Sequence, residues 1–124
     1  MINVGIVGSG FIGPAHIEAL RRLGSVQVVA LCDSSLSQAQ EKARQLNVPH
    51  AYGNVEALLA HPDLHVVHNC TPNHLHAEMN RQILRAGKHV FSEKPLCMTP
   101  EEARELVALA AQAGRVHGVR FVHR

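Results

Sequence analysis

Three glycines near the start of the chain have the spacing of a site that binds phosphate through the backbone. Residues 8–13 read Gly-Ser-Gly-Phe-Ile-Gly, a complete G-x-G-x-x-G pattern. Gly8 allows a tight turn, Gly10 lets a pyrophosphate approach the main chain, and Gly13 allows a helix to pack closely on a strand. The pattern predicts a dinucleotide site if it joins a strand to a helix. The alternative is that the glycines only form a turn.

A carboxylate follows at the distance that such a site requires. Asp33 comes about 20 residues after Gly13, where an acidic side chain accepts hydrogen bonds from the adenosine ribose of NAD. The same charge repels the 2′-phosphate of NADP, and Ser34-Ser35-Leu36 brings no arginine beside it. We therefore expect NAD as the cofactor, with NADP less favoured, and we include Asp33 and Ser34 in its site. The alternative is that Asp33 only helps to begin the next helix.

Two further polar segments could carry chemistry. Residues 69–76 read Asn-Cys-Thr-Pro-Asn-His-Leu-His, and residues 92–96 read Ser-Glu-Lys-Pro-Leu. Each follows a short apolar run, and ligands of open α/β sheets bind at the carboxyl ends of the strands. Taken without the other motifs, Glu93 and Lys94 could equally form a solvated ion pair.

The elements that must position these residues alternate along the chain. β-branched runs predict strands at 2–7, 26–32, 50–52, 65–70, 89–92 and 116–122. Helical periodicity predicts helices at 11–23, 35–46, 54–60, 73–86 and 99–113. The first helix is expected to turn Ala15, Ala19, Leu20 and Leu23 inwards. This alternation predicts one α/β domain over residues 1–124, a doubly wound Rossmann fold with a mostly parallel six-stranded sheet.

Composition limits the classes of function. The chain has 124 residues, of which 46% are hydrophobic and 18% charged, which suffices for a packed core. A net charge of +2 and only 3% aromatic residues argue against a nucleic-acid surface. No apolar run approaches the roughly 20 residues that span a bilayer. We expect a cytoplasmic protein with reduced cysteines and neither nucleic-acid nor membrane partners.

The ten histidines raise the question of a metal site. Their spacing relative to one another and to the three cysteines predicts no metal. His76 is expected beside the cofactor or substrate. His16, His61 and His117 are expected at the surface or at its boundary.

The last predicted strand leaves an apolar edge. Val119 and Phe121 lie on either side of Arg120 there, and Val122 follows Phe121. An unpaired apolar strand edge tends to find a partner, so we expect that a homodimer can form through it.

The three motifs together resemble the Gfo/Idh/MocA family of nicotinamide-dependent oxidoreductases. The resemblance rests on GIVGSGFIGPAH, CTPNHLHAE and AGKHVFSEKPLCMTPEEA, in that order, and covers nearly the whole chain. It implies that the pyrophosphate is held by Gly8, Gly10, Phe11, Ile12 and Gly13. It also implies that Asp33 holds the adenosine ribose.

The same resemblance assigns the nicotinamide half of the cofactor. Its middle would be lined by Thr71, Pro72, Asn73 and His76. Glu93 would lie near the nicotinamide ribose and Lys94 beside the reacting carbon, where an ammonium can orient a hydroxyl and stabilise alkoxide charge. Pro95 restrains the backbone that orients Lys94, and a cis bond between the two is to be checked.

The resemblance implies a dehydrogenase that moves hydride between nicotinamide and a hydroxyl-bearing carbon of a sugar-like or inositol-like substrate. Family members continue into a second domain with most of the substrate site, so we expect these 124 residues to bind cofactor without turnover. One alternative is a non-catalytic NAD-binding module that senses redox state or regulates a partner. A methyltransferase is a weaker one, because Ile12 stands where a G-x-G-x-G loop has its third glycine.

Overall fold

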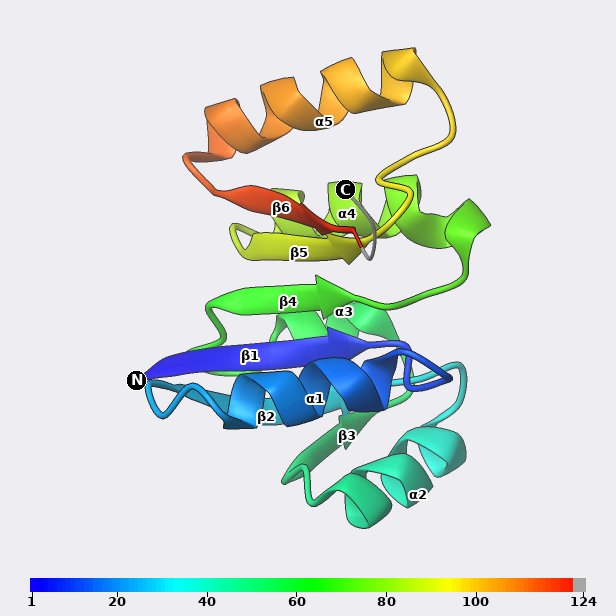
Figure 1. The fold of residues 1–124 in the computed structure, drawn as a ribbon, viewed down its shortest axis with the longest axis vertical. Helices are drawn as coiled ribbons and strands as arrows, with labels where there is room; N and C mark the ends of the chain where they lie inside the picture. The colour runs from blue at the N-terminus through cyan, green and yellow to red at the C-terminus, as the bar shows by residue number, and fades with distance from the viewer. Residues whose placement is uncertain (122–124) are drawn as a thin grey trace.

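One parallel sheet runs through the computed structural model, which describes residues 1–121 (Figure 1). Its six strands are ordered β3-β2-β1-β4-β5-β6, and every adjacent pair is parallel. The order reverses direction between β1 and β4, as in a doubly wound Rossmann fold. The expected fold class is confirmed.

The strands and helices lie close to their predicted positions. The strands are β1 Ile2–Val7, β2 Val26–Cys32, β3 His50–Tyr52, β4 Val66–Asn69, β5 His89–Glu93 and β6 His117–Arg120. The helices are α1 Gly13–Arg21, α2 Leu36–Leu46, α3 Val55–Leu59, α4 His76–Arg85 and α5 Pro100–Ala113, with a 3₁₀ turn at Asn73–Leu75. None of the helices within residues 1–121 is long and apolar enough to cross a membrane.

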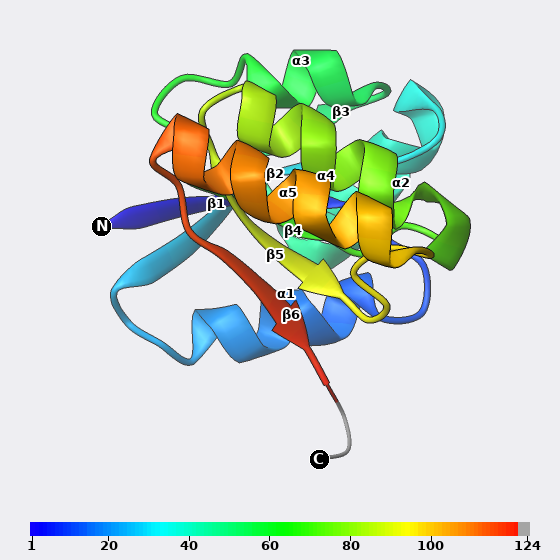
Figure 2. The same cartoon turned by 90° about the horizontal axis from the view of Figure 1, so that it is seen from above.

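The sheet has a hydrophobic core on each face. Figure 2 shows α1 on one side of the sheet and α3, α4 and α5 on the other. Ile17 of α1 and Ala43 of α2 pack with β1 and β2 in one core. Leu58, Ile83 and Leu106, from α3, α4 and α5, pack in the other core.

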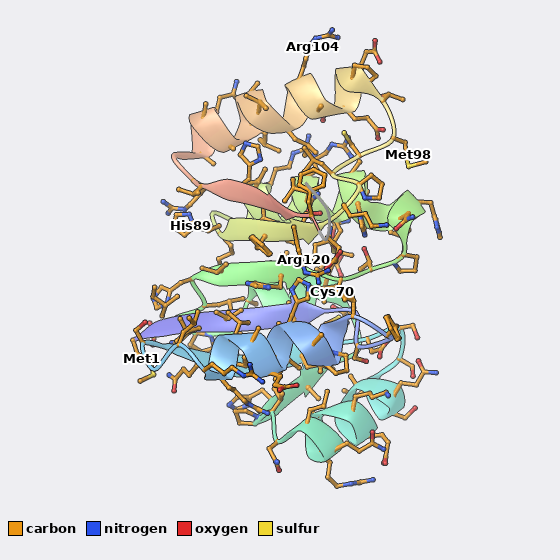
Figure 3. All side chains as sticks on the ribbon, in the orientation of Figure 1. Met1, Cys70, His89, Met98, Arg104 and Arg120 are labelled. Carbon is orange, nitrogen blue, oxygen red and sulfur yellow. The ribbon has the colours of Figure 1, made fainter. Side chains whose placement is uncertain are left out.

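The right-handed crossovers place all carboxyl strand ends along one edge of the sheet. In Figure 3, Cys70 follows β4 at this edge, while Met1 marks the opposite edge. The connections at the carboxyl edge carry the polar segments that the sequence singled out. The fold therefore brings four residues that are distant in sequence to this edge: Gly8, Asp33, Thr71 and Glu93.

Side-chain caps explain where several helices begin. Thr99 is the N-cap of α5, and its hydroxyl accepts a hydrogen bond from the backbone N–H of Glu102 at 3.2 Å. The Glu102 carboxylate accepts in return from the N–H of Met98 at 3.1 Å, one residue before the N-cap, in an arrangement close to a capping box. At the starts of α2 and α3, the side chains of Ser35 and Asn54 likewise accept a hydrogen bond from a backbone N–H three residues later. Each cap contributes about 1 kcal/mol to stability.

The first helix differs from its prediction in both extent and orientation. It begins at Gly13 rather than residue 11, and it buries His16, Ile17 and Leu20. Of the four residues predicted to turn inwards, Leu20 is buried, whereas Ala15, Ala19 and Leu23 are exposed, so the prediction was wrong for those three. The prediction assumed that only apolar residues turn inwards, but a buried polar partner draws His16 to the sheet.

At the edge of the sheet formed by β6, Phe121 is 69% exposed and Val119 is half-buried. Val122, the third residue of the predicted apolar edge, lies outside the described residues. Pairing of two copies through this edge stays a prediction.

Candidate functional site

The glycine loop joins β1 to α1 and is folded tightly against neighbouring backbone. Gly8 has a φ of +90°, and a Cβ there would lie 2.6 Å from the Cys70 carbonyl oxygen. A Cβ on Gly13 would lie 2.5 Å from the Gly8 carbonyl oxygen. These contacts are too short for any side chain, so only glycine fits at either position. A Cβ on Gly10 would meet no atom within 4 Å, so the backbone there is open to a ligand.

Asp33 lies directly after β2, beside the glycine loop. The Ser9 hydroxyl donates a hydrogen bond to Oδ2 of Asp33. The backbone N–H of Ser34 donates to its Oδ1 at 2.8 Å. A carboxylate offers about four lone-pair sites, so both oxygens can still accept from neighbouring hydroxyls. The Asp33 carboxylate is therefore held in a fixed orientation with acceptor capacity left over.

The loop and Asp33 form one side of a cleft of about 630 Å³, within the usual range for small-molecule sites. Eight of the predicted cofactor residues line it: Gly8, Gly10, Phe11, Ile12, Asp33, Ser34, Thr71 and Pro72. Phe11 is 99% exposed at this cleft. The nine-residue α1 begins beside the loop, and helix amino ends carry partial positive charge. The cleft thus combines free backbone donors with one fixed carboxylate.

The cleft also has an apolar side that the sequence analysis missed. Its further lining residues include Val7, Cys32, Val55, Cys70, Leu75 and Met79. Burial, and then the nearby Asp33 and Glu56 charges, raise the pKa of the Cys32 thiol to about 11. Cys32 is therefore neutral and acts as part of this apolar lining.

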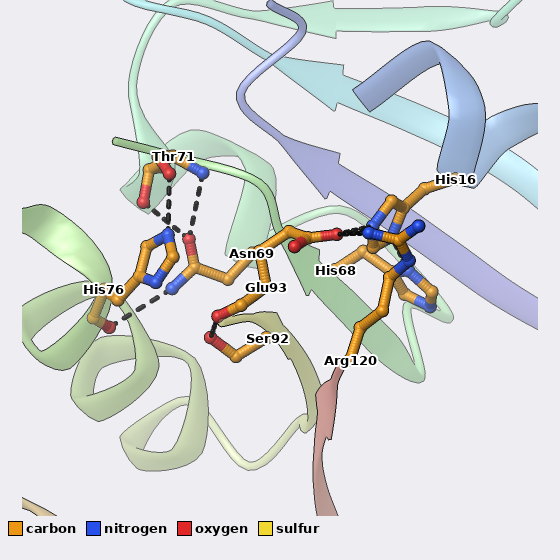
Figure 4. A network of polar contacts seen from close by, with 8 residues as sticks. All are labelled: His16, His68, Asn69, Thr71, His76, Ser92, Glu93 and Arg120. Carbon is orange, nitrogen blue, oxygen red and sulfur yellow. Dashed lines mark hydrogen bonds and ion pairs between the residues drawn. The ribbon is translucent and has the colours of Figure 1, made fainter. Parts of the chain in front are cut away.

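A buried network around the side-chain amides of Asn69 and Asn80 connects the ends of β4 and β5; Figure 4 shows Asn69 with its partner Thr71. Asn69 donates to the Asn80 side-chain oxygen at 2.8 Å, and its own Oδ1 accepts from the Thr71 hydroxyl at 2.6 Å. Asn80 donates to the Ser92 hydroxyl and to the Leu96 carbonyl oxygen, both at 3.2 Å. A buried amide without a hydrogen-bond partner costs free energy, so this network fixes the loop after β4 and the loop after β5 relative to each other.

His76 joins the same two loops through its ring. Its Nδ1 lies 2.5 Å from the Pro95 carbonyl oxygen, and its Nε2 lies 2.7 Å from that of Thr71. The residue is 0% exposed, and it is not among the residues that line the cleft. The structure therefore places His76 behind the loop surface, with both ring nitrogens directed at backbone.

Glu93 ends β5 in a second polar cluster, on the α1 side of the sheet (Figure 4). His16 Nε2 lies 2.7 Å from its Oε1, and Arg120 Nη1 lies 2.8 Å from the same oxygen. Burial opposes ionisation, but hydrogen bonds from His16 and Arg120 outweigh it and hold the Glu93 pKa below its ordinary value. Glu93 is an ionised carboxylate at neutral pH.

His16 is 5% exposed, which makes its predicted place at the surface wrong. Its second ring nitrogen, Nδ1, lies 2.8 Å from Nδ1 of His68. His68 lies on β4, and its ring packs 4.9 Å from that of Phe91. The sequence offered one signal for this cluster: His16 follows Gly13 by three residues, at the first turn of the helix beside the strand ends.

The residues after β5 are more open. Lys94 is exposed, and among residues 1–121 no carboxylate forms an ion pair with it. The Lys94–Pro95 peptide bond is cis. Asn73 is exposed in the 3₁₀ turn before α4. Asn73, Glu93, Lys94 and Pro95 therefore stand near the cleft residues along the strand-end edge without lining the cleft itself.

Residues 2–121 match the family model described as an oxidoreductase family with an NAD-binding Rossmann fold. The chain belongs to the Gfo/Idh/MocA family. Its relatives include D-glucoside 3-dehydrogenase of Escherichia coli, 37% identical over 124 residues that make up 99% of this chain and 35% of that protein.

Two solved structures show the same fold. Levoglucosan dehydrogenase, in complex with NADH and levoglucosan, has a TM-score of 0.86 and 33% identity, covering 95% of this chain and 34% of that one. Biliverdin reductase from Synechocystis sp. PCC 6803, in complex with biliverdin and NADP⁺, has a TM-score of 0.87 and 30% identity, covering 96% and 37%. The chain thus spans about a third of the length of these Gfo/Idh/MocA proteins.

Within this Gfo/Idh/MocA domain, the described residues contain no group of three or more His, Cys, Asp or Glu side chains placed to hold a metal ion. Ser9 and Arg120 are also site residues that the sequence analysis missed. Ser9 occupies a position that the glycine pattern leaves unspecified, and Arg120 reaches Glu93 only because β6 pairs with β5 in this register.

Proposed function

We propose that this chain binds NAD in the cleft and serves as the cofactor domain of a dehydrogenase. The observation that carries the proposal is the open backbone at Gly10, next to the fixed carboxylate of Asp33. A cradle without a side chain suits a pyrophosphate, and an acceptor beside it suits a ribose. The apolar side of the cleft offers cover for a flat base.

The proposed contacts divide according to the part of the cofactor that each residue would touch. Gly8, Gly10, Phe11, Ile12 and Gly13, with the amino end of α1, would hold the pyrophosphate. Asp33 and Ser34 would hold the adenosine ribose. Thr71, Pro72, Asn73 and His76 would shape the middle, while Glu93 and Pro95 would support the nicotinamide end.

Lys94 is the residue that we assign to the reaction itself. When bound, nicotinamide accepts a hydride from a hydroxyl-bearing carbon. The exposed Lys94 ammonium would orient that hydroxyl and stabilise the negative charge that develops on its oxygen. Relatives named as D-glucoside and levoglucosan dehydrogenases support a sugar-like or inositol-like substrate. Because the chain covers about a third of these proteins, we expect it to bind cofactor without turnover by itself.

NAD is the proposed cofactor because of the charge at Asp33. A 2′-phosphate beside this carboxylate would place like charges together, which costs several kcal/mol. Biliverdin reductase, with its NADP⁺, has the same fold, so the fold does not decide the choice. The Asp33 carboxylate supports NAD over NADP.

Calorimetric titration of the 124-residue chain with NADH and NADPH tests this assignment. We expect NADH to bind at least about tenfold more tightly. Asp33→Asn removes the charge and should reduce the NADH preference by about tenfold. Asp63→Asn is the matched control, because Asp63 is exposed, lies outside the cleft and has a positive φ that asparagine adopts well. Equal affinity of the unmodified chain for the two cofactors would contradict the role of Asp33.

A further inference from the structure

His16 and His68 form a series of polar contacts that ends at Glu93. Glu93 Oε1 lies 2.7 Å from His16 Nε2, and His16 Nδ1 lies 2.8 Å from His68 Nδ1. All three residues are at least 90% buried. They come from β5, α1 and β4, so the contacts join segments that are far apart in sequence (Figure 4).

Hydrogen-bond chemistry determines which atom is the donor in each of these contacts. A carboxylate only accepts, so His16 must carry its proton on Nε2. Nδ1 of a neutral His16 is then an acceptor, and His68 must donate from its own Nδ1. The two rings are therefore expected in opposite tautomers, with Glu93 setting the tautomer of His16 and His16 setting that of His68.

The surroundings of Glu93 keep the His68 ring uncharged. The Arg120 guanidinium, 2.8 Å from Glu93 Oε1, already balances the carboxylate. Burial, and then the neighbouring His16, lower the pKa of His68 to about 4. Burial, and then Glu93, raise the pKa of the Cys70 thiol to about 12. His68 and Cys70 are therefore both uncharged at neutral pH, and neither adds a charge beside Glu93 and Arg120.

His16 and Arg120 share one oxygen of Glu93 and leave the other unused. Among residues 1–121, no hydrogen bond is made to Glu93 Oε2. We propose that His16 is a positioning residue: with its second ring nitrogen hydrogen-bonded to His68, it fixes Glu93 so that Oε2 can accept from the nicotinamide ribose. This inference rests on the proposed function.

Two ligands separate positioning of Glu93 from general structural damage. ADP contains the adenosine and both phosphates of NADH but lacks the second ribose and the nicotinamide base, so it cannot donate to Glu93 Oε2. We expect the unmodified chain to bind NADH more tightly than ADP. His16→Leu should reduce NADH affinity by about tenfold and leave ADP affinity within about twofold, since it removes one hydrogen bond to a charged group. His16→Gln keeps an N–H donor and should restore most of the NADH affinity.

The control for packing is Leu20→Ala. Leu20 lies one turn after His16 on α1, is 8% exposed and lines the same hollow beside His68. Its substitution should lower thermal stability without changing the ratio of NADH to ADP affinity. If His16→Leu does not fold, Arg120→Gln replaces it, because the Arg120 side chain is 35% exposed and donates to the same oxygen.

The outcomes are distinct. If the unmodified chain binds neither ligand, the proposed function fails. If it binds both equally, or if His16→Leu and Arg120→Gln lower both affinities together or neither, the positioning role is overturned. Ring ¹⁵N chemical shifts add a test without substitution: at pH 7.5 we expect the proton on Nε2 of His16 and on Nδ1 of His68. The reverse tautomers, or a doubly protonated His16, would also overturn the inference.

Discussion

The glycine-loop end of the site, residues 8–13 with Asp33, is built mainly from backbone, whereas the Glu93 end is built from buried side chains. At the first end, six consecutive residues form the cradle, and one carboxylate completes it. At the second end, His16, His68, Glu93 and Arg120 come from four separate elements. A backbone cradle depends on the absence of side chains, and a side-chain cluster depends on every member being present.

The largest effect that tests this contrast is expected at Gly8. Gly8→Ala forces a Cβ to 2.6 Å from a carbonyl oxygen at a φ of +90°. We expect it to lower the free energy of unfolding by about 2–5 kcal/mol. Gly10→Ala should change stability by less than about 0.5 kcal/mol, since its Cβ meets nothing within 4 Å. Urea unfolding of both variants measures the difference.

The same pair separates folding from binding. Although Gly10→Ala should fold normally, its methyl group would fill space that the cradle leaves for a pyrophosphate, so NADH affinity should fall at least about tenfold. Unchanged NADH binding by Gly10→Ala would show that the loop is a tight turn and not a cradle.

The second-largest effect is expected in the pH dependence of the free energy of unfolding, which tests the Glu93 end of the site. The folded chain holds the His68 pKa at about 4, against 6.5 for the exposed side chain. As pH falls from about 6.5 to about 4, the unfolded chain takes up a proton at this residue and the folded chain does not. The free energy of unfolding should therefore decrease by on the order of 3 kcal/mol over this window and be unaffected by His68 above it.

His68→Phe keeps a ring that packs on Phe91 and removes the titrating group. Its unfolding free energy, measured by urea at several pH values between 7 and 4, should fall less steeply than that of the unmodified chain. Parallel curves for the two proteins would mean that His68 takes up its proton while folded. The cluster would then tolerate charge, and the contrast between the two ends would be weaker.

This contrast also explains what the sequence could predict. The parallel sheet and the glycine cradle were predictable because both depend on local patterns: apolar runs, and positions where only glycine fits. Leu23 and His16 were misplaced because helix orientation was judged from hydrophobicity alone, while a carboxylate 77 residues away determines the burial of His16. The Asn69–Asn80 network was missed for the same reason, since its members are ordinary polar residues until the fold brings them together.

The smallest effect concerns the one side chain that supports the glycine-loop end from within. Ser9 is 1% exposed, and its hydroxyl donates to Asp33. Ser9→Ala should lower the free energy of unfolding by about 1 kcal/mol and weaken NADH binding about two- to tenfold. Because Asp33 is proposed to hold the adenosine ribose, which ADP shares with NADH, the affinities for NADH and ADP should fall by the same factor in calorimetric titrations. His16→Leu is expected to separate them. A loss confined to NADH in Ser9→Ala would mean that the two ends of the site do not act independently.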